Sequence, residues 1–246
     1  YMEDKGSHIA LDVGEQLTVE QCLYGIMLAS ANDAAHALAE HVGGTYENFI
    51  LMMNEKAKEL GCLNTHFTNP HGLPDESHVT SAYDMALITK AALQFDMFRT
   101  ISGTPYYEIL PTEQQKDLIC MYNHHKMIGK TKYQNEEVFA GKNGYTHAAG
   151  QTLVTCARRD GMEIVCVVMG DQGEEVYKDT LSLVNYGLDG FTKVKIGEVK
   201  AGFEEMLKKE SPVFENCFIS QFDTENAWVI VPNGVAVSDL QIQFQY

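Results

Sequence analysis

The chain has few basic residues and lacks the long apolar runs of a membrane protein. It carries 18 Lys and Arg against 34 Asp and Glu, which gives a formal net charge of −16. Binding a nucleic-acid backbone needs clustered basic side chains, so no nucleic-acid partner is expected. No stretch approaches the roughly 18 consecutive apolar residues that predict a membrane-spanning helix. The composition therefore argues against a nucleic-acid-binding protein and against a protein with membrane-spanning helices.

Metal and redox motifs are also missing. The six cysteines and nine histidines are scattered, with no C-x-x-C pair and no H-E-x-x-H sequence. The sequence therefore predicts no metal and no organic cofactor. Free thiols are the plain interpretation, although six cysteines would also permit disulfides in an exported protein.

The length of 246 residues suits one large domain, or one domain followed by part of another. Hydrophobic residues make up 45% and charged residues 21%, which is ordinary for a globular protein. The chain begins with Tyr1, shows no signal segment, and ends in an alternating, strand-like stretch at residues 241–246. We expect both ends to be truncated.

Residues 18–94 carry the pattern of a helical region. Thr18 to Gln21 form a capping-box sequence before apolar residues at helical spacing. A second helix is predicted over residues 33–41, ended by two glycines, and a third after Thr45. A loop rich in Gly and Pro follows at residues 64–78, and a fourth helix is expected over residues 82–93, capped by Thr80 or Ser81.

The pattern changes to strands near residue 150. Residues 151–158 and 163–169 are predicted strands joined by Asp160-Gly161, a pair favoured in type I′ hairpins. In that register Cys156 and Cys166 lie on opposite faces, which argues against a disulfide between them. The second strand is apolar throughout, which predicts cover on both faces.

A helix is expected over residues 174–186, and the character of the sequence shifts again after Gly190. Short β-like segments occur at residues 214–222, 228–231 and 240–244, interrupted by Pro and Asn-Gly. We predict a first domain over residues 1–190 and the beginning of a small β domain over residues 191–246.

Three short motifs carry chemical information. They are Ser-Ala-Asn at residues 30–32, Asn-Pro-His-Gly-Leu at residues 69–73 with Ala-Tyr-Asp-Met-Ala at residues 82–86, and Gly-Lys-Asn-Gly-Tyr-Thr at residues 141–146. Each has a simpler explanation. Ser30-Ala31-Asn32 could merely cap the next helix, Lys142 could be a solvated turn lysine, and the Asn-Pro-His-Gly-Leu sequence is common loop chemistry.

In combination, the order of these motifs resembles the serine D-alanyl-D-alanine carboxypeptidases, the low-molecular-weight penicillin-binding proteins. Enzymes of this superfamily share the motifs S-x-x-K, S-D-N and K-T-G, and this branch has S-x-N in second place. The resemblance implies an α+β fold like that of penicillin-binding proteins and β-lactamases. Such a domain has a helical lobe and an antiparallel sheet flanked by helices, and a small β domain follows it.

The resemblance also implies roles for individual residues. Ser30 would relay a proton to the leaving amine, and the amide of Asn32 would hold the substrate backbone. Lys142 would place a positive charge near the terminal carboxylate of the substrate. The substrate-binding strand continues through Asn143, Gly144, Tyr145 and Thr146, with Gly144 allowing close approach and the Tyr145 amide completing the oxyanion hole.

Two departures from the family pattern stand out. No Ser-x-x-Lys sequence, which would supply the nucleophile and its base, occurs in the 246 residues. We expect it upstream of Tyr1, and the alternative is a pseudoenzyme that lost it. The third motif has Asn143 where the family has threonine or serine, which puts binding of the substrate carboxylate in question.

The resemblance implies a peptidase of the cell envelope. Its substrate would be a peptidoglycan stem peptide ending in D-Ala-D-Ala, and β-lactam antibiotics would be covalent inhibitors of the complete protein. The location would be extracytoplasmic, with membrane contact only through segments outside this sequence. The alternatives are a non-catalytic peptidoglycan-binding module and, less well supported, a β-lactamase, which would need a deacylating glutamate.

Overall fold

The computed structural model describes residues 6–195 and 228–235. The chain divides into two compact units, which are described separately. The first comprises Tyr1–Arg158 and Glu163–Val184, and the second comprises Arg159–Met162 and Asn185–Tyr246. Among the described residues, no helix is both long enough and apolar enough to cross a membrane.

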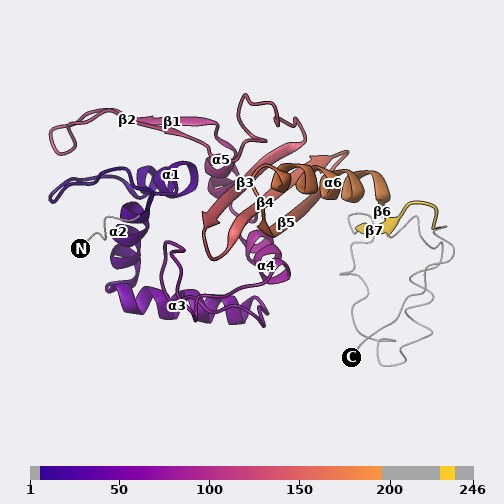
Figure 1. Cartoon of the computed structure of the whole chain (residues 1–246), viewed down its shortest axis with the longest axis horizontal. Helices are drawn as coiled ribbons and strands as arrows, with labels where there is room; N and C mark the ends of the chain where they lie inside the picture. Colours follow the sequence, from indigo (N-terminus) through magenta and orange to yellow (C-terminus); the bar gives the residue numbers. More distant parts are fainter. Residues whose placement is uncertain (1–5, 196–227, 236–246) are drawn as a thin grey trace, which may run out of the picture. The chain divides into compact units, whose positions relative to one another are not determined.

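The first unit opens with three helices, α1 (Val19–Ala29), α2 (Asn32–Gly43) and α3 (Tyr46–Glu59) (Figure 1). The predicted capping box is confirmed. Gln21 N donates to Thr18 Oγ1 at 3.1 Å, while Thr18 N donates to Gln21 Oε1 at 2.8 Å. These reciprocal bonds satisfy two of the backbone donors that a helix start leaves free.

The next boundaries follow the same local chemistry. Thr45 caps α3 as predicted, and Ser81 rather than Thr80 caps α4 (Ala82–Ala92) through the Asp84 amide at 3.1 Å. Gly61, just past α3, has the left-handed φ of +82° that ends many helices. The loop between the two helices pairs His66 with Val79 in an isolated antiparallel bridge.

Three elements carried no clear sequence signal. They are α5 (Asp96–Gly103) and a two-stranded antiparallel ribbon of β1 (Tyr106–Ile109) and β2 (Ile119–Tyr122). Each strand has only four residues, too few to establish a period of two. The ribbon and α5 pack on α1 and bury its last turns, and Leu28 is completely inaccessible to solvent. This core fixes the point where α1 ends.

The central sheet is antiparallel, in the order β3 (Val138–Thr146), β4 (Gly150–Arg159) and β5 (Met162–Asp171). Helix α5 packs against β3, and α6 (Glu175–Gly190) crosses the sheet in Figure 1. The α+β fold class is therefore as predicted. Helix α6 begins one residue after the predicted start at 174 and ends at Gly190, beyond the predicted end at 186.

The β4–β5 turn confirms the hairpin prediction. Asp160 has φ +49° and Gly161 has φ +76°, and a type I′ turn requires both central residues to have positive φ. Cys156 and Cys166 are buried free thiols. Burial raises the pKa of Cys156 to about 12 and that of Cys166 to about 11, so both are poor nucleophiles at neutral pH.

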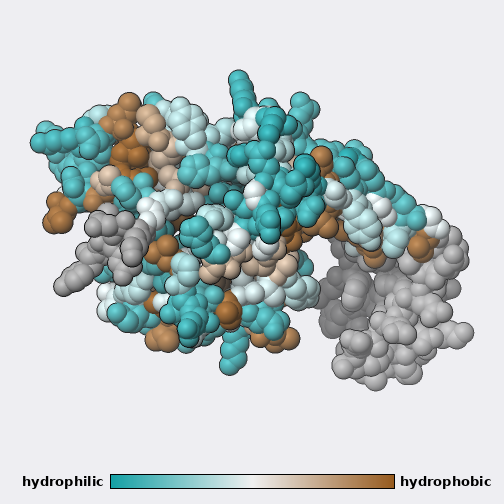
Figure 2. Space-filling view, viewed as in Figure 1, coloured by the Kyte–Doolittle hydropathy of each residue, from teal (hydrophilic) through white to brown (hydrophobic). Residues whose placement is uncertain are grey.

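The prediction that the second strand of this hairpin is covered on both faces was wrong for the described structure. Only Met162 and Cys166 of β5 are buried, and Met169 is 39% exposed. Within the described residues β5 pairs with β4 alone, so its other edge has no neighbour there. Figure 2 shows hydrophobic residues at the surface in the region where α6 and the sheet overlap in Figure 1.

In the second unit, β6 (Phe191–Lys195) pairs antiparallel with β7 (Trp228–Pro232). The strand predicted at residues 228–231 is confirmed. The predicted strands at residues 214–222 and 240–244 lie outside the described residues. The boundary at residue 190 stays a prediction.

We predict that Gly161→Ala lowers the free energy of unfolding by about 1 kcal/mol, because a Cβ is disfavoured at positive φ. No atom lies within 4 Å of the position that a Cβ would take, so steric overlap does not contribute. Gly190→Ala, at the end of α6 and with equally open space, is the matched control and should be neutral or stabilising. Urea denaturation of both variants measures the difference, and equal losses would contradict the turn assignment.

Candidate active site

Ser30 lies at the junction of α1 and α2, where the chain reverses. It is the C-cap of α1 and adopts a left-handed backbone with φ +56°, which is uncommon for a residue other than glycine. The α2 N-cap is Ala31, and no side chain caps that helix. The simpler interpretation, that a side chain of the Ser-x-Asn motif caps the following helix, is therefore wrong. Backbone strain held at such a point is typical of functional sites.

Lys142 lies within β3, paired with Val154 of β4, and is not a turn lysine. Its Nζ donates hydrogen bonds to Ser30 Oγ at 2.5 Å, to the backbone oxygen of Asn143 at 2.7 Å and to Asn143 Oδ1 at 3.3 Å. Two of the three predicted motifs thus meet, although 112 positions separate them in the chain.

The ammonium group of Lys142 is largely removed from water. Burial lowers its pKa from 10.5 to about 8, because desolvation disfavours the charged form. The pKa of His124 is lowered by burial and by the charge of Lys142. Burial lowers the pKa of His125 to about 4, with a smaller contribution from Lys142. At neutral pH both imidazoles are therefore uncharged beside the ammonium.

The remaining predicted residues continue along β3. A Cβ at Gly144 would lie 2.6 Å from Thr152 Oγ1, so a side chain there would require the Thr152 hydroxyl to move. Tyr145 is 57% exposed, and its hydroxyl lies 3.2 Å from His147 Nδ1. The Thr146 hydroxyl accepts a hydrogen bond from Ala149 N and so supports the β3–β4 turn.

Two residues near the motifs were missed in the sequence. Asp33 is buried and accepts backbone hydrogen bonds from Ile9, Leu11 and Ala34. His125 is completely buried, and its Nε2 lies 2.8 Å from Thr155 Oγ1. Asp33 carried only the weak signal of an acid in a first helical turn, and a lone histidine carried none.

His125 explains the glycine that precedes Lys142. A Cβ at Gly141 would lie 2.6 Å from His125 Cδ2 and 2.5 Å from the backbone oxygen of Val154. The imidazole therefore packs directly on the β3 backbone, and any side chain at position 141 would require the β4 backbone or His125 to shift. Within the described residues, His125 Nδ1 has no hydrogen-bond partner.

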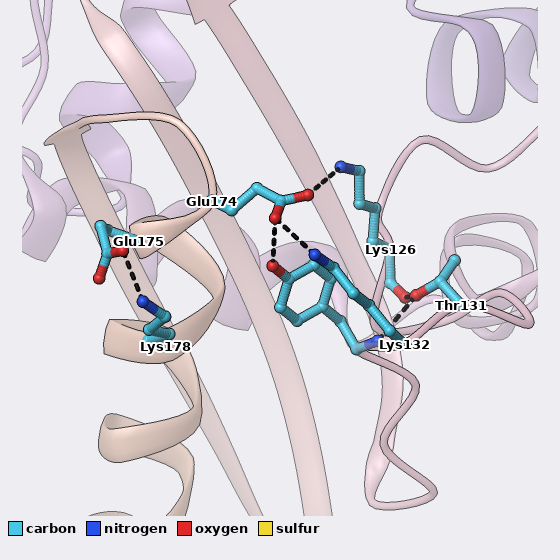
Figure 3. A network of polar contacts seen from close by, with 7 residues as sticks. Lys126, Thr131, Lys132, Glu174, Glu175 and Lys178 are labelled. Carbon is cyan, nitrogen blue, oxygen red and sulfur yellow. Dashed lines mark hydrogen bonds and ion pairs between the residues drawn. The ribbon is translucent and has the colours of Figure 1, made fainter.

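A polar network holds the segment that follows His125 (Figure 3). The Glu174 carboxylate, just before α6, binds Lys132 Nζ at 2.7 Å, the Tyr133 hydroxyl at 2.7 Å and Lys126 Nζ at 3.3 Å. Hydrogen bonds from Lys132, Tyr133 and Lys126 lower the pKa of Glu174 to about 2. The network ties residues 126–133 to the start of α6.

No group of three or more His, Cys, Asp and Glu residues that could hold a metal ion occurs within residues 6–195 and 228–235. The polar groups that meet at the site are the Lys142 amine, the Ser30 hydroxyl and the Asn143 side-chain amide.

Comparison with known proteins decides the family. The sequence profile described as D-alanyl-D-alanine carboxypeptidase matches residues 1–173. The chain belongs to the D-alanyl-D-alanine carboxypeptidase family. It is 41% identical over 165 residues to DacF of Bacillus subtilis, covering 67% of this chain and 41% of DacF. It is 34% identical over 163 residues to DacB2 of Mycobacterium tuberculosis, covering 65% of this chain and 53% of DacB2.

Solved structures agree with this assignment. A D-alanyl-D-alanine carboxypeptidase of Mycobacterium tuberculosis superposes with a TM-score of 0.67 at 30% identity, covering 76% of this chain and 70% of that one. The DD-transpeptidase of Streptomyces gives 0.68 at 27% identity, covering 75% and 72%. The chain spans about half the length, or less, of the curated relatives named above.

We predict that Lys142→Met raises the melting temperature at pH 7 by roughly 5 °C, because the buried charge costs stability. The folded-state pKa of about 8 is below the unfolded value of 10.5, so the folded state binds fewer protons between these values. The stability of the wild type relative to Lys142→Met therefore increases as pH rises from 8 to 10.5.

Thermal unfolding at pH 7 and pH 10 tests this, with exposed Lys130→Met as the matched control. Because Lys130 is exposed, the control should change the melting temperature at pH 7 much less than Lys142→Met does. A gap between wild type and Lys142→Met that stays constant with pH would contradict a desolvated Lys142.

Proposed function

We propose that the protein is a serine-type D,D-carboxypeptidase that removes the terminal D-alanine from peptidoglycan stem peptides. The observation that carries the proposal is the contact of Lys142 Nζ with Ser30 Oγ at 2.5 Å in a dehydrated site. Family membership supplies the reaction class. In such a reaction a serine attacks the carbonyl between two D-alanines, and water later cleaves the acyl-enzyme.

The geometry supports a division of roles around Lys142. The ammonium donates to Ser30 Oγ, which leaves the hydroxyl proton free to pass to the leaving amine as that amine gains charge. The same ammonium, in a low-dielectric setting, attracts the terminal carboxylate of the peptide more strongly than an exposed lysine would. Asn32 would hold the substrate backbone, and the β3 edge from Gly144 to Thr146 would pair with it.

Asn143 replaces the usual threonine without removing the donor. Its Oδ1 accepts from Lys142 Nζ at 3.3 Å, which orients the side-chain amide. With Oδ1 bound to the lysine, the amide NH₂ would be the group that meets a substrate carboxylate. Asn143 is thus proposed to bind the substrate carboxylate through an N–H in place of a hydroxyl.

The relatives suggest the wider setting. A substrate in the cell wall implies an extracytoplasmic, envelope-associated protein, and β-lactams are proposed as covalent inhibitors because they imitate D-Ala-D-Ala. Nucleic acid is not a proposed partner, given the charge of −16. We propose that residues 1–190 belong to the catalytic domain and residues 191–246 to a small β domain. Membrane contact would come through segments outside this sequence.

A fluorescent penicillin tests the proposal in the full-length natural protein. Covalent, stoichiometric labelling is expected, followed by D-alanine release from a stem pentapeptide. Lys142→Ala should slow labelling by about 100-fold, since a preorganised charge at the substrate carboxylate is lost. Muropeptide binding with neither labelling nor D-alanine release would contradict the enzyme and favour a binding module. Rapid nitrocefin turnover would instead indicate a β-lactamase.

The 246-residue chain by itself should not be acylated, because it has no Ser-x-x-Lys to supply an activated nucleophile. Intact-mass spectrometry after incubation with penicillin measures this, and DacF of Bacillus subtilis is the positive control. A mass increase at any serine of this chain would refute the prediction and place the nucleophile within the sequence.

A further inference from the structure

Residues 6–11, here called the strap, lie against the α1–α2 junction and contact Asn32 at two points. Asn32 N donates to the backbone oxygen of Ser7 at 2.9 Å. Gly6 has φ +128°, and a Cβ there would lie 2.3 Å from Asn32 Nδ2. The strap therefore adjoins both the backbone and the side-chain amide of the residue proposed to hold the substrate.

The strap is itself held by one carboxylate. Asp33 Oδ2 accepts from Ile9 N and from Leu11 N, both at 3.1 Å, and Oδ1 accepts from Ala34 N at 2.9 Å. Asp33 is only 6% exposed. Because the side-chain oxygens of Asp33 are buried, water does not compete well for these hydrogen bonds.

The backbone of the strap is shaped to fit this carboxylate. Ala10 adopts a left-handed conformation with φ +60°, which costs energy in a residue with a Cβ. This conformation lets two amides on either side of Ala10 reach the same side chain. Without the carboxylate, the buried Ile9 amide would lose its hydrogen-bond acceptor. The strained turn at Ala10 would then lose the two hydrogen bonds that stabilise it.

We propose that Asp33 is a positioning residue, which fixes Asn32 by anchoring the strap across the Ser-x-Asn motif. Asp33 acts through residues 6–11 and touches no substrate. That this role matters for catalysis rests on the proposed function. The positioning of Asn32 by Asp33 is independent of that function, and it can be measured in the chain without any enzymatic activity.

Amide hydrogen exchange by NMR on the 246-residue chain tests the proposal. In Asp33→Ala the exchange of the Ile9, Leu11 and Asn32 amides should accelerate by about ten-fold or more, with α3 amides unchanged. The side-chain NH₂ resonances of Asn32 should also shift. Asp33→Asn, which keeps one acceptor oxygen, should give intermediate rates.

Asp84→Ala is the matched control. Asp84 is also a buried acid in a first helical turn, but it accepts from the Asn64 amide and the Thr65 hydroxyl and not from the strap. It should leave the Asn32 resonances unchanged. Equal acceleration at Asn32 in both variants, or an unchanged Asn32 in Asp33→Ala with a freed strap, would overturn the proposal.

Gly6→Ala is the second variant if Asp33→Ala does not fold. The added Cβ meets Asn32 Nδ2, so the Asn32 side-chain resonances should move while the Asp33 hydrogen bonds persist. Unmoved Asn32 resonances would show that the strap does not determine the position of the amide. Absence of penicillin labelling in the full-length protein, with these NMR results intact, would count against the proposed function alone.

Discussion

The site depends on a single ammonium group kept in a place with little water. Lys142 exchanges its hydration for three protein oxygens, one on Ser30 and two on Asn143. These oxygens do not fully replace the lost hydration, because burial still lowers the pKa of Lys142 to about 8. A charge held at such a cost depends on protein groups that stay in place around it. The core around Leu28 fixes the position of Ser30, and the β3–β4 register fixes the position of Lys142.

The features that sequence could predict are those decided by neighbours in the chain. Thr18 and Gln21 cap α1 through bonds spanning three residues, and Asp160-Gly161 specify a turn by their own backbone preferences. The Lys142 and Ser30 pairing was accessible only through family resemblance, because nothing local relates positions 112 apart. Helix α5 and the β1–β2 ribbon are short, and tertiary packing rather than period decides them.

The supporting residues were invisible for a different reason. Asp33 would pass for an ordinary acid in a first helical turn, since its partners, Ile9 and Leu11, lie 24 and 22 positions earlier. Glu174 would pass for a solvated residue, although it gathers two lysines and a tyrosine from a loop over 40 positions away. Both functions exist only after the fold has formed. The close approach of His125 to Gly141 likewise arises only in the folded chain, and no pattern of residue types in the sequence reveals it.

The two histidines beside the lysine show why a positive site can exist in so acidic a chain. A second charge there would repel the ammonium, and burial keeps His125 neutral with a pKa of about 4. His124 is likewise shifted downward by burial and by Lys142. An anionic ligand would therefore meet one localised charge, whose effect is strongest at close range in a dry setting. The net charge of −16 acts through water and salt, which screen it beyond about 10 Å. Under the proposed function, local desolvation rather than overall charge would decide which ligands this site attracts.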